Sequence, residues 1–220
     1  MSDTILVINA GSSSIKFYLY DIDDKAALAP RLGGQLEGIG TSHPRLRVRD
    51  AAGQTLVERD IAPSHAPDVP NGQEVVGTWL SGHLGGAPLA VGHRVVHGGP
   101  DLSEPVIVDD AILARLEAYT PLAPLHQPNN LAPIRVIRER RPWIPQVACF
   151  DTAFHRSHSD VADRYALPDK LYQQGVRRYG FHGLSYEYIA QRLRQALPEI
   201  AMGKICLLYT SPSPRDVEES

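Results

Sequence analysis

Cysteine is scarce in this chain of 220 residues, which contains only Cys149 and Cys206. Two cysteines without paired spacing indicate neither a disulfide framework nor a structural zinc site. The sequence also lacks an apolar run of the roughly 18 residues that a membrane span needs. Its first residues enter an apolar segment at once, without a basic leader or a cleavage site. These absences predict a soluble, cytoplasmic protein with no membrane partner.

An excess of charge of either sign is missing as well. The formal net charge is -3, and without a basic footprint nucleic acid is not expected as a partner. An anionic substrate would have to be held by local cations, because the field of the whole molecule would not attract it. The chain is 43% hydrophobic and 21% charged, which is typical of a globular protein of one large domain or two small ones.

The most informative segment is residues 4–17, TILVINAGSSSIKF. Residues 4–8 are apolar or β-branched and predict a strand buried on both faces. Small polar residues then predict a tight turn, and the alternation that follows predicts a return strand with one polar face. Small turn residues let N–H and hydroxyl groups approach an anion, and Lys16 adds a point charge. Asn9 offers a neutral oxygen that suits Mg²⁺ or its waters. An ordinary hairpin with a serine-rich turn explains the same segment.

The order of the remaining elements predicts an α/β domain with a mixed sheet, because an early strand meander is followed by alternating strands and helices. We place a hinge just after Asp151. The expected strands cover residues 29–36, 46–49, 88–99, 146–151 and 204–209; the expected helices cover 73–84, 109–119, 130–141 and 184–196; surface loops are expected over 60–73 and 122–130.

Four polar residues stand at the ends of apolar strands or in tight loops. Arg94 interrupts an apolar strand, and Asp151 ends another at the edge where α/β sheets place ligand groups. His126 lies in a proline-rich loop, and His182 is flanked by glycines. Each has a structural alternative: an arginine in a strand can form an ion pair, an aspartate can cap a helix, and a loop histidine can be incidental.

Five segments of the sequence resemble the acetokinase family, the acetate kinases of the superfamily that also holds sugar kinases, actin and heat-shock chaperones. The segments are VINAGSSSIKF (7–17), GHRVVHGG (92–99), PLAPLHQPNN (121–130), ACFDTAFH (148–155) and RRYGFHGLSYEYI (177–189). Their order and spacing also match the family, over roughly residues 3–206. The resemblance implies a ribonuclease-H-like (actin-like ATPase) α/β fold, a mixed sheet flanked by helices. Residues 1–151 would form a complete first lobe, 152–206 the start of a truncated second lobe, and 207–220 a non-native or disordered tail.

The resemblance further implies a Mg²⁺-dependent, reversible transfer of the γ-phosphate of ATP to acetate, giving acetyl phosphate and ADP. It assigns metal contact to Asn9 and phosphate binding to Ser12, Ser14 and Lys16. It assigns catalysis to Asp151, His182, Arg94 and His126, and the acyl pocket to Arg94, Val96, Leu125 and Phe181. A homodimer is implied for the full-length protein by kinship alone.

Elementary chemistry refines the expected role of Asp151. A carboxylic acid with a pKa near that of Glu, about 4.3, is already ionised at neutral pH. No general base is then needed, so we assign Asp151 to positioning Mg²⁺ or the substrate rather than to removing a proton. The obstacle is the approach of two anions, which alignment and positive charge overcome.

The C-terminal end departs from the family. Family members are about twice as long, and the expected strand at 204–206 should lead into a phosphate loop. Instead the chain continues LLYTSPSPRDVEES from Leu207. We therefore expect no kinase activity from this polypeptide alone. Two alternatives stay open, a propionate or butyrate kinase and a non-catalytic nucleotide-binding fragment. The segments RYGFHG and PLHQPNN count against a sugar kinase or an actin-like ATPase.

Overall fold

One mixed sheet organises the protein, as the computed structural model shows for residues 3–23, 25–83 and 86–207. The described strands lie in the order β5-β4-β3-β2-β1-β6-β8-β7. β1, β6 and β8 run parallel to one another, and the other neighbours pair antiparallel. The strands are β1 (Thr4–Ala10), β2 (Ser14–Ile22), β3 (Leu28–Glu37), β4 (Arg45–Asp50), β5 (Thr55–Asp60), β6 (Ala90–Val95), β7 (Val106–Ile107) and β8 (Gln146–Phe150).

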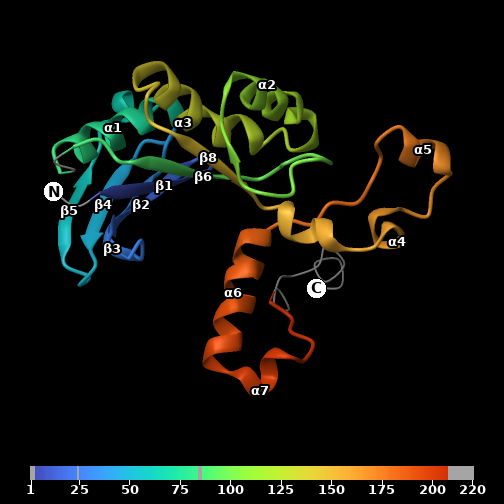
Figure 1. The fold of residues 1–220 in the computed structure, drawn as a ribbon. Helices are drawn as coiled ribbons and strands as arrows, with labels where there is room; N and C mark the ends of the chain where they lie inside the picture. The colour runs from blue at the N-terminus through green and yellow to red at the C-terminus, as the bar shows by residue number, and fades with distance from the viewer. Residues whose placement is uncertain (1–2, 24, 84–85, 208–220) are drawn as a thin grey trace, which may run out of the picture.

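Helices flank this sheet. α1, α2 and α3 gather on one side of it, whereas α6 and α7 extend away on the other (Figure 1). The helices are α1 (Val69–Ser81), α2 (Asp110–Ala118), α3 (Gln127–Arg140), α4 (Asp160–Asp163), α5 (Asp169–Gln173), α6 (Gly183–Ala196) and α7 (Pro198–Ala201), with short 3₁₀ turns at Pro63–His65, Thr120–Leu122 and Ala153–Ser157. None of the helices in the described ranges is long and apolar enough to cross a membrane.

The β1–β2 hairpin confirms the prediction for residues 4–17. The Gly11 N–H donates to the Ser14 carbonyl at 2.8 Å and closes the turn. The apolar side chains of β2 are buried, and Lys16 and Tyr18 between them are exposed. The prediction that β1 is buried on both faces was wrong, because only alternate residues of β1 are fully buried. The residues between them point away from α1 and α3 and are only half-buried.

Two helices begin earlier than the sequence pattern predicted. α1 begins at Val69 because the Asp68 carboxylate accepts from the Asn71 N–H at 2.9 Å, so the predicted loop over 60–73 was wrong in its last part. α3 begins at Gln127, since Pro128 suits the first turn of a helix, which shortens the predicted loop over 122–130. The end predicted for α1, residue 84, lies outside the described residues.

Other predictions fail where tertiary contacts decide. β5, β7, α4 and α5 were not predicted, and Lys204–Cys206 form no strand, although a strand was expected over 204–209. A strand needs a neighbour to pair its backbone groups, and the sheet formed by the described residues includes no pairing with this segment. The strand predicted over 88–99 is shorter than expected, as β6 ends at Val95. Most of the predicted tail, residues 208–220, lies outside the described residues.

A separate polar centre organises the segment after the sheet. Asp163 is buried and accepts hydrogen bonds from Arg156 at 2.7 Å, Tyr172 at 3.0 Å and Arg177 at 3.2 Å. Burial alone would raise the pKa of Asp163, but hydrogen bonds from His158, Arg156 and Tyr172 bring it below its usual value. Both apolar clusters of the core, by contrast, belong almost entirely to residues before 151.

Candidate active site

The carboxyl ends of β1, β6 and β8 bring three polar side chains together. The Arg94 Nε–H donates to both oxygens of Asp151 at 3.1 Å, and Nη2 donates to Oδ2 at 2.5 Å. Arg94 Nη1 donates to Asn9 Oδ1 at 3.1 Å. The strand register explains this grouping, since Ile8 pairs with His93 and Arg94 pairs with Cys149. The edge is the one at which α/β proteins bind ligands.

The ion pair between Arg94 and Asp151 is buried on one side only. The Asp151 side chain is 2% exposed and that of Arg94 is 31% exposed. One hydrogen each on Nε, Nη1 and Nη2 is engaged, so Nη1 and Nη2 each keep one to donate. The carboxylate therefore orients a guanidinium whose outer edge can still bind an anion. This geometry is compatible with a structural ion pair at Arg94. It is also compatible with a ligand-binding role for Arg94.

The serine-rich hairpin lies next to this group. Lys16 pairs with Asn9 across β1 and β2, so both side chains emerge on the same face of the sheet. The Lys16 side chain is exposed, and within the described part of the chain it forms no ion pair. Ser12 is exposed and Ser14 is half-buried. The hairpin thus presents one uncompensated cation and accessible hydroxyls beside Arg94.

A backbone hydrogen bond joins the loop that carries His182 to Asp151. The Gly183 N–H donates to the Asp151 carbonyl at 2.9 Å. His182 itself has φ of 59° and ψ of 20°, a left-handed conformation that is strained for a residue with a side chain. A Cβ on Gly183 would lie 2.3 Å from the Asp151 oxygen, so glycine is required there. The close approach of the two backbones puts the His182 loop against the end of β8.

Two amides of α3 hold the backbone around this site. Asn130 accepts from the Val96 N–H at 2.9 Å and donates to the Ala10 carbonyl at 2.5 Å, which links β6 to β1. Gln127 accepts from the His97 N–H at 3.2 Å and donates to the His97 carbonyl at 3.0 Å. Neither residue was predicted from the sequence to have a role. The sequence did contain a signal for them, since both are uncharged polar residues of the segment PLHQPNN.

The residues expected to line an acyl pocket differ widely in exposure. Val96 is buried, but Leu125 is 75% exposed and Phe181 is 40% exposed. His126 is exposed and precedes α3, and no hydrogen bond joins it to Arg94 or Asp151 in the described residues. Within those residues the expected pocket is therefore open to solvent. The roles of Val96, Leu125, Phe181, His126 and His182 stay predictions.

Two buried histidines of the segment 92–99 are neutral at physiological pH. His93 Nε2 bonds to Gln146 Oε1 at 2.8 Å in the core, and His97 Nδ1 accepts from the Gly99 N–H at 2.8 Å. The His97 ring packs edge-on against Tyr179, with centroids 4.4 Å apart. Burial lowers the pKa of each histidine from 6.5 to about 4.

This burial predicts that the free energy of unfolding falls as the pH is lowered from 7 to 5. A histidine whose pKa is depressed in the folded state binds its proton more readily once unfolded, so stability is lost between pH 6.5 and 4. We expect a loss on the order of 2 kcal/mol per histidine at pH 5, measured by urea denaturation. In His93→Gln the same pH change should cost about half as much. An equal loss in the variant would contradict the assignment.

Two oxygen-bearing side chains at the strand ends decide whether Mg²⁺ could bind here. Asp151 supplies one carboxylate and Asn9 one amide oxygen, and the described residues hold no cluster of three or more His, Cys, Asp or Glu side chains that could bind a metal. Mg²⁺ keeps several waters and is usually held by one or two carboxylates together with substrate phosphates. Asp151 and Asn9 offer oxygens of the kind that this mode uses, and these oxygens also accept hydrogen bonds from Arg94. They could therefore give an ion only their remaining lone pairs, and an ion held by protein ligands alone does not fit.

The mixed sheet, its flanking helices and the charged group at the carboxyl ends of its parallel strands define the class as a ribonuclease-H-like α/β protein. The sequence pattern of the acetokinase family matches residues 4–206. The chain belongs to this family.

Curated relatives agree with this assignment. The chain is 53% identical over 207 residues to the acetate kinase of Nitrobacter hamburgensis, covering 94% of this chain and 51% of the relative. It is 50% identical over 207 residues to the acetate kinase of Rhizobium meliloti, covering 94% and 52%. The chain thus spans about half the length of the curated relatives it matches.

Solved structures show the same partial coverage. The Porphyromonas gingivalis acetate kinase is 35% identical with a TM-score of 0.74, covering 90% of this chain and 49% of that one. A propionate kinase from Francisella tularensis is 32% identical with a TM-score of 0.77, covering 89% and 49%. The similarity therefore confirms the predicted fold class and corresponds to one half of the family structure.

Proposed function

We propose that this chain forms one half of an acetate kinase, with a first lobe over residues 1–151 and the start of a second lobe over 152–206. The complete enzyme would transfer the γ-phosphate of ATP reversibly to acetate and give acetyl phosphate and ADP. The observation that carries the proposal is the Arg94–Asp151–Asn9 group beside the serine-rich hairpin at the parallel strand ends. Close relatives named acetate kinase support it.

The residues of this chain suit a direct transfer between two anions. Acetate is ionised at neutral pH, so no side chain needs to remove a proton. The outer N–H groups of Arg94 would bind the acetate carboxylate or the transferring phosphoryl group, and Lys16 would approach the nucleotide phosphates together with the hydroxyls of Ser12 and Ser14. Asp151 would position the substrate through Arg94, because its oxygens accept the guanidinium fork.

Mg²⁺ is part of the proposal, with Asn9 and Asp151 as the residues that would hold it. When bound it would neutralise charge on the phosphoryl oxygens, as is usual in phosphoryl transfer. His182 and His126 would stabilise the phosphoryl group from the loops that carry them. Val96, Leu125 and Phe181 would surround the methyl group of acetate once the second half of the enzyme covers them.

A propionate kinase is the second candidate, favoured by the similarity to the Francisella tularensis structure. Leu125 and Phe181 are exposed, so the described residues do not enclose a pocket that would separate a two-carbon from a three-carbon acid. A fragment that binds nucleotide without chemistry is the third. Homodimer formation and a cytoplasmic location are also proposals and rest on the family.

A chimeric enzyme tests the proposal. Residues 1–206 would be joined to the second half of the Nitrobacter hamburgensis acetate kinase, since the two proteins are 53% identical over the shared half. With ATP and Mg²⁺ we expect acetyl phosphate from acetate, trapped as the hydroxamate, at a higher kcat/KM than with propionate. The 220-residue chain alone should give none, because half of the site is missing.

The outcomes separate the candidates. A kcat/KM higher for propionate than for acetate would favour the propionate kinase. A folded chimera that binds ATP but phosphorylates neither acid would contradict the kinase and favour the non-catalytic fragment. Acetyl phosphate formed by the 220-residue chain alone would contradict the proposal that this chain carries only half of the active site.

A further inference from the structure

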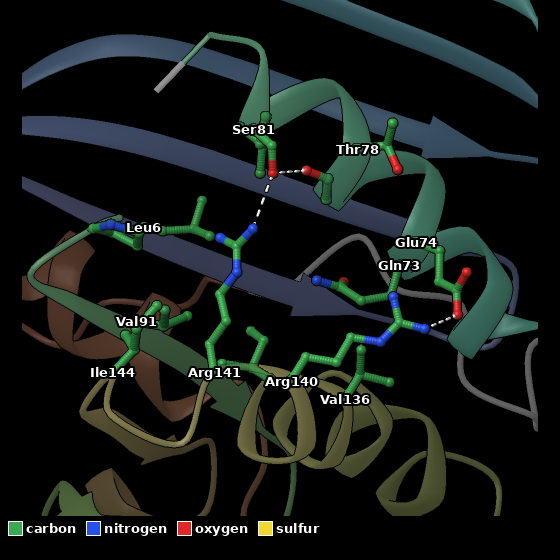
Figure 2. A pocket seen from close by; sticks show the side chains of 14 residues that line it. Leu6, Gln73, Glu74, Thr78, Ser81, Val91, Val136, Arg140, Arg141 and Ile144 are labelled. Carbon is green, nitrogen blue, oxygen red and sulfur yellow. Dashed lines mark hydrogen bonds and ion pairs between the residues drawn. The ribbon is translucent and has the colours of Figure 1, made fainter. Parts of the chain in front are cut away.

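Some buried polar atoms in the described part of the chain have no hydrogen-bond partner, among them Gln73 Oε1 and His97 Nε2. Gln73 lines a cavity between α1 and the end of α3, where Figure 2 shows side chains of both helices. Gln73 Oε1 itself is closed to water, so a ligand in that cavity would not reach it. His97 lies elsewhere, directly after Val96, beyond the end of β6 that carries the candidate active site.

Hydrogen bonds fix both the backbone and the ring of His97. The Gln127 side chain accepts from the His97 N–H at 3.2 Å and donates to the His97 carbonyl at 3.0 Å. The Gly99 N–H donates to His97 Nδ1 at 2.8 Å, so the proton of the neutral ring is on Nε2. A buried ring that is held in this way has little freedom to turn. It can therefore act as a firm support for the side chains that pack on it.

Three aromatic rings pack around His97. The ring centroid of Tyr119, which follows α2, lies 6.4 Å from that of His97. The rings of Tyr179 and Phe181, which precede α6, contact His97 edge-on with centroids 4.4 Å and 5.9 Å away. Phe181 directly precedes His182 in the chain. His97 thus links the end of β6 to the loop that carries Phe181 and His182.

The buried position of His97 determines how it could affect a substrate. His97 Nε2 is closed to water, so a substrate would not touch it. Phe181, by contrast, is 40% exposed while its ring contacts His97. Any effect of His97 on a bound acid would therefore pass through Phe181.

We propose that His97 is a positioning residue whose ring supports Phe181 and thereby limits the space for the carbon chain of the acid. The proposal rests on the proposed function, in which Phe181 and Val96 border the methyl group of acetate. Without the His97 ring, Phe181 would turn into the vacated space and the acyl pocket would widen. The enzyme would then discriminate less between acetate and a longer acid.

Two substitutions separate the ring of His97 from its hydrogen bond. His97→Phe keeps an aromatic ring but loses the acceptor for the Gly99 N–H, whereas His97→Asn keeps an acceptor oxygen but loses the ring. The readout is the ratio of kcat/KM for acetate to that for propionate in the chimera described above. We expect His97→Asn to lower this ratio roughly tenfold, because one methylene in a hydrophobic pocket is worth about 10- to 200-fold. His97→Phe should keep the ratio.

His93→Gln is the matched control, since it replaces the other buried histidine of the same segment. The described residues show no ring contact between His93 and the loop of Phe181, and His93 bonds instead to Gln146. This variant should leave the ratio unchanged even where it lowers the stability. A ratio that stays the same in His97→Asn, or that falls equally in His97→Phe, would overturn the proposal.

A double-mutant cycle in the 220-residue chain tests the support of Phe181 without any substrate. His97→Asn, Phe181→Leu and the double variant are compared by urea denaturation, and the two losses should be non-additive because the rings are in contact. Additive losses would overturn the proposal. A chimera that phosphorylates neither acid would contradict the proposed function, and the cycle would still decide whether His97 supports Phe181.

Discussion

Replacing Arg94 with alanine is expected to lower the free energy of unfolding of this chain by about 2–4 kcal/mol. The substitution leaves the Asp151 carboxylate, 2% exposed, without the guanidinium that satisfies both of its oxygens. Removing one partner of a buried pair usually costs about 3–5 kcal/mol. We expect the lower range because about a third of the Arg94 side chain is exposed to water.

A double-mutant cycle with urea denaturation measures this effect. Arg94→Ala, Asp151→Ala and the double variant are compared, and the double variant should be less destabilised than the sum of the single ones, since it leaves no buried charge. Arg94→Lys is the conservative control: it keeps the charge but not the planar fork, so it should restore only part of the stability. Additive losses would contradict a stabilising pair.

The same substitution should have a large effect on catalysis in the chimeric enzyme. We expect Arg94→Ala to remove about 2–4 kcal/mol of transition-state stabilisation, as for the loss of a strong donor in other enzymes. That corresponds to a decrease in kcat/KM of roughly 30- to 1000-fold. The assay is made at a temperature where denaturation curves show the variant to be folded. Near wild-type turnover would contradict the assignment of Arg94 to the reacting groups.

Gly183→Ala is the second substitution with a large expected effect. The new Cβ would lie 2.3 Å from the Asp151 carbonyl oxygen and 2.7 Å from Phe154 Cβ. A backbone oxygen cannot rotate away as a side chain can, so the His182 loop must move and the Gly183–Asp151 hydrogen bond must lengthen. Overpacking of this kind costs about 1–3 kcal/mol. In the chimera a shift of the loop by about 1 Å should lower kcat on the order of 10²-fold.

The measurement for Gly183→Ala has an internal control. Gly77→Ala makes the same chemical change in a helix where the Cβ meets nothing within 4 Å, and it should stabilise the chain by up to about 1 kcal/mol. Thermal or urea denaturation of both variants separates the steric clash from the general effect of adding a methyl group. Equal behaviour of the two variants would mean that the Asp151 carbonyl does not restrict residue 183.

Local sequence patterns predicted the elements whose signals lie within a few residues. The alternation in residues 15–19 was sufficient for β2. The helix predicted over 109–119 is α2, and the Asp109 carboxylate caps it by accepting from the Ile112 N–H at 2.7 Å. The same kind of reasoning did not find β5 or β7. Their few residues carry weak periodicity, and they exist because β4 and β8 offer them backbone partners.

The residues of the candidate site also fall into two groups, those that the sequence indicates and those that only the packing reveals. Asn9, Arg94 and Asp151 stood out in the sequence because each is a polar residue that interrupts or ends an apolar strand. Asn130 did not stand out, although it bonds to Ala10, 120 positions away in the chain. A polar residue in the first turns of a helix is common, and only the packing of α3 on β1 and β6 makes this one a link between two strands.

The sequence by itself determined the hairpin, the three apolar strands that end in polar residues and the family to which they correspond. Only the tertiary structure decided that Asp151 pairs with Arg94, 57 residues away, and that residue 183 lies against the Asp151 carbonyl. The reason is physical. Local preferences act over one turn or one strand, whereas the partner of a buried charge depends on the register of parallel strands joined by long crossovers.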